Sequence, residues 1–253
     1  MAKVKIGIEG MDEALDGGIP EGNIVLVSGG AGTGKSTFCL QFLMNGAAQF
    51  GEKSLYISTE QDPEELHRQA DKYGWKLDDL EKKGLLKLVY FDITANTDFF
   101  NSIQQLVAEF KPKRIVVDSL TTLTDTLLIS GAGERESIAT AQLTDAVSST
   151  PRSESILAKS ILFHLIKELK GFEVTTLLTS ELKEDSKELS ADGISEFITD
   201  GVILMHYIAV GVGDYRTMLV RKMRYGNYNK DIIPYSITEK GITLVDAAAE
   251  AEL

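Results

Sequence analysis

Short runs of aliphatic and β-branched residues alternate along this chain with segments that repeat their apolar residues every three or four positions. The runs cover residues 24–28, 54–59, 85–91, 114–118, 174–179 and 201–206. Between two of them, Phe99, Ile103 and Val107 mark the apolar face of a predicted helix. The alternation predicts an α/β fold with a mostly parallel, doubly wound sheet and helices on both faces.

The C-terminal part has a different pattern, in which turns rather than helices separate runs at residues 218–224, 232–237 and 242–245. Strands joined by short turns pair antiparallel. We therefore expect antiparallel strands at the end of the sheet. Earlier in the chain, Asp62, Pro63 and Glu65 predict a helix start, with Asp62 as the cap and Glu65 completing a capping box.

Chain length favours one large domain, since 253 residues with 43% hydrophobic content can bury a single core. We predict this domain over residues 1–246 and an acidic tail at 247–253. Residues 130–154 are rich in Ser, Thr, Gly and Ala. A mobile surface loop is the simpler interpretation of that segment, and a pore or partner-binding loop is the alternative.

Charge and cysteine content limit the partners and the compartment. Lys and Arg number 26 against 38 Asp and Glu, so the formal net charge of −12 disfavours binding to nucleic acid or anionic membranes. The single Cys39, expected to be buried, cannot form an intramolecular disulfide. The longest apolar run, residues 202–210, is too short to span a bilayer, and the first residues lack a secretion signal. We expect a cytoplasmic protein without membrane attachment.

A phosphate-binding loop of the form GxxxxGK[ST] follows the first strand-like run, and a helix is predicted to begin near Lys35. The predicted nucleotide-binding residues are Gly29, Gly30, Ala31, Gly32, Thr33, Gly34, Lys35, Ser36 and Thr37. Glycines let the backbone approach a polyphosphate closely, while N–H groups at the helix start face its oxygens. The glycine spacing does not fit the GxGxxG of dinucleotide folds.

Four side chains supply the expected chemistry of this site. Lys35 would bridge the β- and γ-phosphates, and Ser36 would bind Mg²⁺ through its hydroxyl. Asp118 ends a strand expected beside the P-loop strand, where it would hold a magnesium-bound water. Glu60 follows another strand and is the candidate base for the attacking water. The histidines, at positions 67, 164 and 206, lack metal-site spacing. His164 lies at the edge of a helix's apolar face, so we expect a packed structural residue rather than a catalyst.

Beyond these motifs, the stretch from Ile8 to Gly22 leading into the P-loop resembles the KaiC-like branch of the RecA/RadA superfamily. The likeness continues at residues 58–61, 118–121, 179–181, 194–201, 222–224 and 234–238. The resemblance implies a RecA-like fold and an ATPase that binds ATP or ADP with Mg²⁺. Family members form rings of six subunits with ATP between neighbours, so it also implies a homo-oligomer, as a hexamer.

The same resemblance assigns residues that act across the subunit boundary. Lys222 and Arg224 would reach the γ-phosphate held by the adjacent subunit, as arginine fingers do. The adenine would be surrounded, also from the adjacent subunit, by Phe197, Arg216, Ile237 and Glu239.

This chain departs from the circadian clock protein of the family at several positions. It has Glu60-Gln61 where the clock protein has two glutamates, so we expect slow turnover. Glu196-Phe197 stand at the positions of the phosphorylated Ser-Thr pair, so autokinase activity is not expected. The chain also has one domain where the clock protein has two.

Three functions are compatible with the sequence. An ATP-hydrolysing ring that couples its nucleotide state to an unknown protein partner agrees best with the motifs. A recombination mediator of the RadA kind would bind single-stranded DNA through Arg135 and Arg152, but the acidic charge disfavours it. A non-hydrolysing ATP-dependent sensor or scaffold is the third, because Gln61 replaces a carboxylate.

Overall fold

The computed structural model describes residues 1–92, 99–130, 151–184, 186–210 and 213–245. Its main feature is a nine-stranded sheet with the order β11-β10-β9-β8-β3-β7-β6-β4-β5. The strands of this sheet are β3 (Ile24–Gly29), β4 (Ser54–Ser58), β5 (Leu86–Tyr90), β6 (Arg114–Asp118), β7 (Thr175–Glu181), β8 (Gly201–Val210), β9 (Gly213–Met223), β10 (Ile233–Thr238) and β11 (Gly241–Leu244). Strands β3 to β8 pair parallel, and β9 to β11 add antiparallel, which confirms the predicted fold class.

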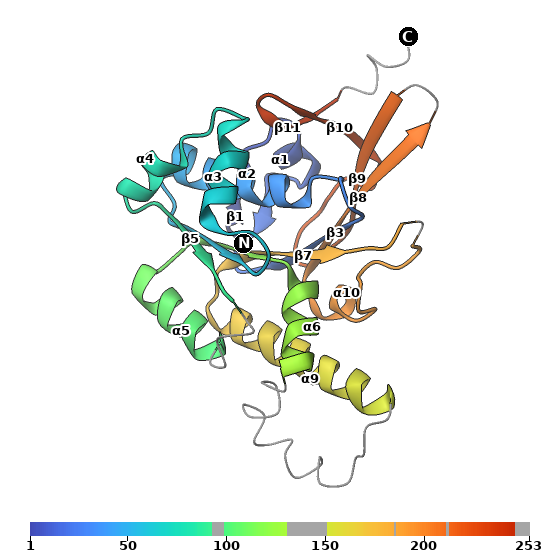
Figure 1. Cartoon of the computed structure of the whole chain (residues 1–253). Coiled ribbons are helices and arrows are strands. Elements are labelled where there is room, and N and C mark those ends of the chain that lie inside the picture. The colour runs from blue at the N-terminus through green and yellow to red at the C-terminus, as the bar shows by residue number, and fades with distance from the viewer. Residues whose placement is uncertain (93–98, 131–150, 185, 211–212, 246–253) are drawn as a thin grey trace.

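Helices cover both faces of the sheet (Figure 1). Helices α2, α3 and α4 lie on one side, and α5, α6 and α9 lie on the other. The helices are α1 (Met11–Ala14), α2 (Lys35–Phe50), α3 (Pro63–Asp71), α4 (Leu77–Lys82), α5 (Phe99–Phe110), α6 (Leu120–Ser130), α9 (Pro151–Gly171) and α10 (Ser195–Ile198).

Burial on both faces explains why the strands read as continuous apolar runs rather than alternating ones. In β4, Tyr56 packs on the α2 side of the sheet, whereas Leu55 and Ile57 pack on the α5 and α9 side. In β3, residues 24–27 are fully buried and divide between the same two clusters. The parallel strands therefore form the shared centre of two helix-covered cores.

Some local predictions are confirmed and some boundaries differ. The Asp62 capping box is present at the start of α3, with both reciprocal hydrogen bonds formed. The small antiparallel sheet of β1 (Lys3–Val4) and β2 (Ile19–Pro20) has strands too short for the sequence pattern to reveal. Residues 151–154, expected within the long loop, belong to α9, and α6 extends to Ser130. The rest of that loop, residues 131–150, and the tail at 247–253 lie outside the described residues.

Candidate nucleotide-binding site

The phosphate-binding loop joins the end of β3 to the start of α2 and requires glycine at two well-defined places. Gly34 has a φ of 92°, and a Cβ there would lie 2.7 Å from Cδ1 of Ile237. A Cβ at Gly29 would lie 2.4 Å from the Met205 carbonyl oxygen. Larger residues would displace the loop from its neighbours, so the glycines preserve its shape.

The start of α2 offers its backbone N–H groups to an acceptor outside the helix. Gly34 is the N-cap residue and no side chain caps the helix. The first turn also contains no acidic residue that would compete for these donors. Because a helix N-terminus carries partial positive charge, this end suits a phosphate group.

Lys35 is the cation of the loop and is almost completely buried. Its Nζ donates to the Gly30 carbonyl oxygen at 3.1 Å and lies 3.7 Å from Oε1 of Glu181. Glu181 lies in the stretch 179–181 that resembles the family, but the sequence alone assigns it no role. Its position at the end of β7, the strand next to β3, is the signal that would have placed it here.

Asp118 ends β6 and is buried at the same edge of the sheet. Its Oδ1 accepts a hydrogen bond from the Thr179 hydroxyl and its Oδ2 accepts one from Tyr56, both at 2.5 Å. The expectation that its strand neighbours the P-loop strand is wrong, because β7 lies between β3 and β6. The hydroxyl of Ser36 and the carboxylate of Asp118 are the hard oxygen ligands that Mg²⁺ prefers, so these residues fit the ion.

Glu60 lies just beyond the end of β4, where its carboxylate is held by two hydroxyls. Ser119 and Thr122 each donate to its Oε1 at 2.5 Å. A groove of about 830 Å³ is lined by Glu60 and Gln61 together with Lys35 and Ser36 of the P-loop. The structure thus brings the candidate base and the phosphate-binding residues to one cavity.

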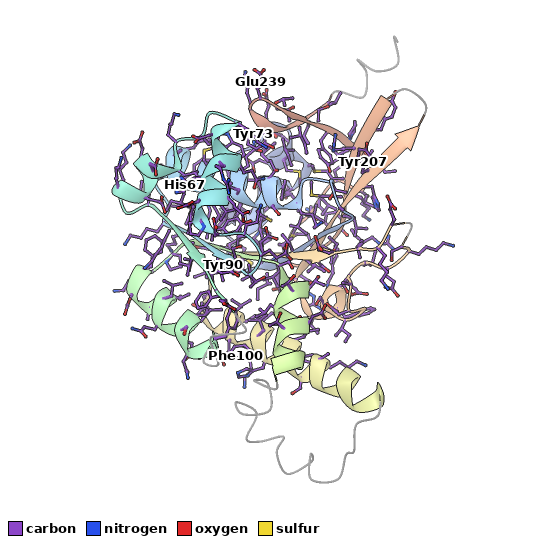
Figure 2. All side chains as sticks on the ribbon, viewed as in Figure 1. His67, Tyr73, Tyr90, Phe100, Tyr207 and Glu239 are labelled. Atoms are coloured by element: carbon purple, nitrogen blue, oxygen red, sulfur yellow. The ribbon has the colours of Figure 1, made fainter. Side chains whose placement is uncertain are left out.

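Arg216 and Ile237, two of the residues expected at the adenine, lie beside the P-loop of their own chain. The Nε of Arg216 donates to the Gly32 carbonyl oxygen at 3.3 Å, and Ile237 lies against Gly34 and lines the groove. Glu239 is exposed at the turn between β10 and β11 (Figure 2). Arg216 and Ile237 therefore need no adjacent subunit to reach a nucleotide in this groove.

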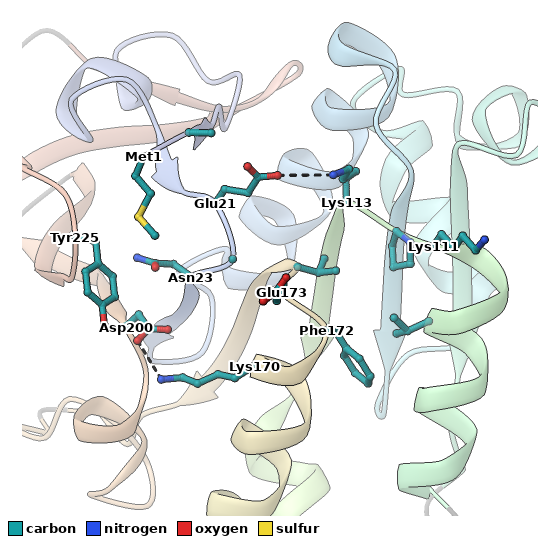
Figure 3. A pocket seen from close by; sticks show the side chains of 15 residues that line it. Met1, Glu21, Asn23, Lys111, Lys113, Lys170, Phe172, Glu173, Asp200 and Tyr225 are labelled. Carbon is teal, nitrogen blue, oxygen red and sulfur yellow. Dashed lines mark hydrogen bonds and ion pairs between the residues drawn. The ribbon is translucent and has the colours of Figure 1, made fainter.

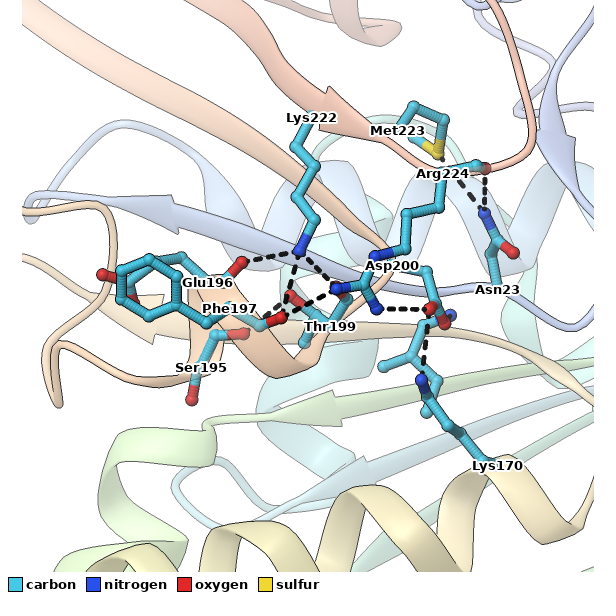
Figure 4. Close-up of polar contacts among 11 residues, drawn as sticks. Asn23, Lys170, Ser195, Glu196, Phe197, Thr199, Asp200, Lys222, Met223 and Arg224 are labelled. Atoms are coloured by element: carbon cyan, nitrogen blue, oxygen red, sulfur yellow. Dashed lines mark hydrogen bonds and ion pairs between the residues drawn. The ribbon is translucent and has the colours of Figure 1, made fainter.

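The amino ends of the parallel strands, opposite the P-loop, carry Lys222, Arg224 and Phe197 (Figure 4). The Nζ of Lys222 donates to the carbonyl oxygens of Glu196, Phe197 and Thr199, at 2.8, 3.3 and 2.6 Å. Arg224 donates to the Phe197 carbonyl oxygen at 3.0 Å and pairs with Asp200 at 3.3 Å.

Lys222 and Arg224 thus contact residues 196–200 of their own chain rather than the P-loop. Burial lowers the pKa of Lys222, and the nearby positive charge of Arg224 lowers it further. Asp200 opposes this shift in pKa.

The backbone hydrogen bonds show how far these cations lie from their own P-loop. Arg224 N–H donates to the Asp200 carbonyl, and Asp200 N–H donates to the carbonyl of Ile24, the first residue of β3. The P-loop begins at Gly29, the last residue of the same strand. At about 3.3 Å per residue, the two ends of β3 are roughly 17 Å apart.

A second hollow, of about 950 Å³, lies at this far edge (Figure 3). Its walls carry charges of both signs, including the ion pairs Glu21–Lys113 at 3.7 Å and Lys170–Asp200 at 3.1 Å. Although it is larger than the P-loop groove, it lies at the amino ends of the parallel strands. Open α/β sheets bind ligands at the carboxyl ends, where the P-loop groove is found.

Other candidate residues have structural environments. Cys39 is buried, and its pKa is raised by burial and then by the charge of Asp118. His164 packs edge-on against Phe100, although it is exposed to solvent. His67 is flanked by Asp78 at 3.6 Å and Glu81 at 2.9 Å, which links α3 to α4. The spacing of residues in the sequence does not reveal this cluster of His67, Asp78 and Glu81, because its members come from two different helices.

A P-loop at the carboxyl ends of a doubly wound parallel sheet, with Glu60 in the same groove and Asp118 at the end of a neighbouring strand, defines a RecA-like P-loop nucleotide-binding protein. The family model described as "ATPase: KaiC" matches residues 4–139 and 132–249. The chain belongs to this KaiC ATPase family, and that membership supports ATP binding at the P-loop.

Individual relatives agree with this assignment. A UPF0273 protein of Thermotoga maritima is 34% identical, with 96% of this chain and 95% of the relative covered. The circadian clock oscillator protein KaiC of Parathermosynechococcus lividus is 29% identical over 98% of this chain, which spans only 43% of that relative. The crystal structure of a KaiC-like protein from Pyrococcus horikoshii OT3 superimposes with a TM-score of 0.78 at 31% identity, covering 97% of this chain and 99% of that one.

Within the described parts of the chain, none of the helices combines the length and the apolar character needed to cross a membrane.

Proposed function

We propose that this protein is a magnesium-dependent ATPase that works as a homo-oligomer, a hexamer by its family, with ATP held between neighbouring subunits. The observation that carries the proposal is the groove lined by Lys35, Ser36 and Glu60 at the carboxyl ends of the parallel strands. Asp118 ends β6 on the same side of the sheet. Coupling of the nucleotide state to a protein partner in the cytoplasm is part of the proposal.

Each residue has a role that follows from its position. The P-loop N–H groups and Lys35 bind the phosphate oxygens and offset their charge. Glu60 orients the attacking water and accepts its proton. Ser36 and Asp118 would hold Mg²⁺, which, when bound, neutralises charge on the β- and γ-phosphate oxygens.

The far edge of the sheet supports catalysis across a subunit boundary. Lys222 and Arg224 lie too far from their own P-loop to reach a γ-phosphate there, whereas an adjacent subunit could place its P-loop against them. Phe197, exposed beside them, would meet the neighbour's nucleotide, as would Glu239, while Arg216 and Ile237 act in their own chain. Cations supplied in this way stabilise charge on the transferred phosphoryl group.

Lys35→Ala tests the site itself. The variant should bind ATP about 10–100-fold more weakly, because charge-assisted hydrogen bonds to the phosphates are lost. It should also release no phosphate above background. Lys82→Ala, which removes an exposed lysine of α4 outside the groove, is the matched control and should bind ATP like the parent. Equal affinity of Lys35→Ala and the parent in calorimetry would refute the site.

A non-hydrolysing sensor remains the second candidate, because Gln61 lines the groove where a second carboxylate would serve hydrolysis. Phosphate release measured on the assembled, ATP-bound protein separates the two. Tight binding without turnover would select the sensor, and steady turnover would select the ATPase.

A further inference from the structure

Tyr56 is a buried tyrosine of β4 on the same face of the sheet as the candidate magnesium ligands. It pairs in register with Val116 of β6, so Asp118, two positions further along β6, lies diagonally across from it on that face. Diagonal neighbours of this kind are within reach of an aromatic side chain. The ring packs among the residues beneath α2 and is fully buried.

The Tyr56 hydroxyl is one of two hydroxyls that hold the Asp118 carboxylate. It donates to Oδ2 of Asp118 at 2.5 Å, while Thr179, from the other side, donates to Oδ1. Burial raises the pKa of Tyr56 well above its usual value, and the charge of Asp118 raises it further.

The direction of these hydrogen bonds suits a cation site, because Tyr56 and Thr179 both donate and the Asp118 carboxylate only accepts. Packing does not require this arrangement, since phenylalanine would fill the same space without burying a hydroxyl.

We propose that Tyr56 is a positioning residue for Mg-nucleotide, whose hydroxyl holds the Asp118 carboxylate in the orientation that receives the cation. This inference rests on the proposed function, because it assumes that Mg²⁺ binds with the nucleotide at the P-loop. Tyr56 touches neither nucleotide nor cation and acts through Asp118.

Tyr56→Phe tests the proposal by removing one oxygen and keeping the ring. Binding of a fluorescent ATP analogue is measured in EDTA and across a Mg²⁺ titration. We expect the half-saturating Mg²⁺ concentration to rise about tenfold, as for other residues that orient metal ligands. The affinity in EDTA should stay within about twofold, because the loop donors and Lys35 are unchanged. Tyr228→Phe, which loses a phenolic bond to the Arg221 carbonyl outside the groove, is the matched control and should match the parent.

The outcomes separate this inference from the function on which it rests. A parent protein with no magnesium-dependent nucleotide binding would contradict the proposed function. A parent that needs Mg²⁺, with Tyr56→Phe showing the same half-saturation, would overturn the role of Tyr56 alone. If Tyr56→Phe does not fold, Thr179→Val releases the other oxygen of Asp118 and should raise the half-saturation in the same direction. An unchanged value there would also overturn the proposal.

Discussion

At the scale of single residues, Glu60 has the position expected of a catalytic base. Its carboxylate is fixed by Ser119 and Thr122 beside the P-loop, although it takes no part in holding the loop. The residue can therefore affect turnover separately from binding.

Glu60→Gln should lower the ATPase rate by a factor of about 10²–10⁴, the usual contribution of a general base. ATP affinity should change little, because the phosphate donors remain in place. Phosphate release and calorimetric binding, measured on the same preparation, check both parts. Gln61→Ala is the comparison, and a loss of turnover as large as that of Glu60→Gln would contradict the assignment of the base.

The sequence predicted the motif residues of the site but not their supports. Lys35 and Ser36 come from the P-loop motif, whereas Asp118 and Glu60 come from strands followed by a polar residue. Lys35, Ser36 and Glu60 line one groove, and Asp118 ends a strand on the same side of the sheet. Tyr56 and Thr179 were not predicted to have a role, because a tyrosine or threonine in a buried strand looks like packing. Only the pairing register of separate strands shows that both reach Asp118.

At the scale of elements, the contact between α2 and β6 depends on an arginine buried at the start of β6. Arg114 lies over the rings of Phe42 and Phe50, at 4.6 and 5.3 Å, and its Nε donates to Glu52 at 2.6 Å. Burial lowers the pKa of Arg114, and Glu52 opposes that shift. A Cβ at Gly46 would lie 2.3 Å from the Arg114 Nε, so only glycine fits on this face of α2.

Gly46→Ala should therefore destabilise the fold by about 1–3 kcal/mol, the usual cost of overpacking a filled core. In an open helix the same change would stabilise it by roughly 0.5–1 kcal/mol. Gly171→Ala at the end of α9, where no atom lies within 4 Å of the added Cβ, is the control and should not destabilise. The free energy of unfolding of both variants is measured in urea. If Gly46→Ala has the same stability as the parent, Arg114 moves aside freely and the prediction is wrong.

The elements themselves were well predicted, because each parallel strand is an apolar run and the intervening helices have clear periodicity. Strand order was not, since β7 enters between β3 and β6 through contacts remote in sequence. The start of α9 was missed for another reason. Pro151 followed by polar residues reads as a loop, but proline is also well suited to a helix start.

At the scale of the whole molecule, the functional residues divide between two edges of one sheet. The P-loop, Asp118 and Glu60 occupy the carboxyl edge, and Lys222 and Arg224 occupy the other (Figures 1 and 4). The two sets lie apart in a single chain, so the proposed assembly of several copies would be what brings them together.

The most direct test of the account is the ATPase rate per subunit as a function of protein concentration, with assembly followed by light scattering. The parent should gain specific activity as it assembles, and Arg224→Ala should assemble and bind ATP but lose turnover by about 10³–10⁵-fold, as arginine fingers do. Constant specific activity at all concentrations, or an Arg224→Ala variant as active as the parent, would contradict catalysis across the subunit boundary.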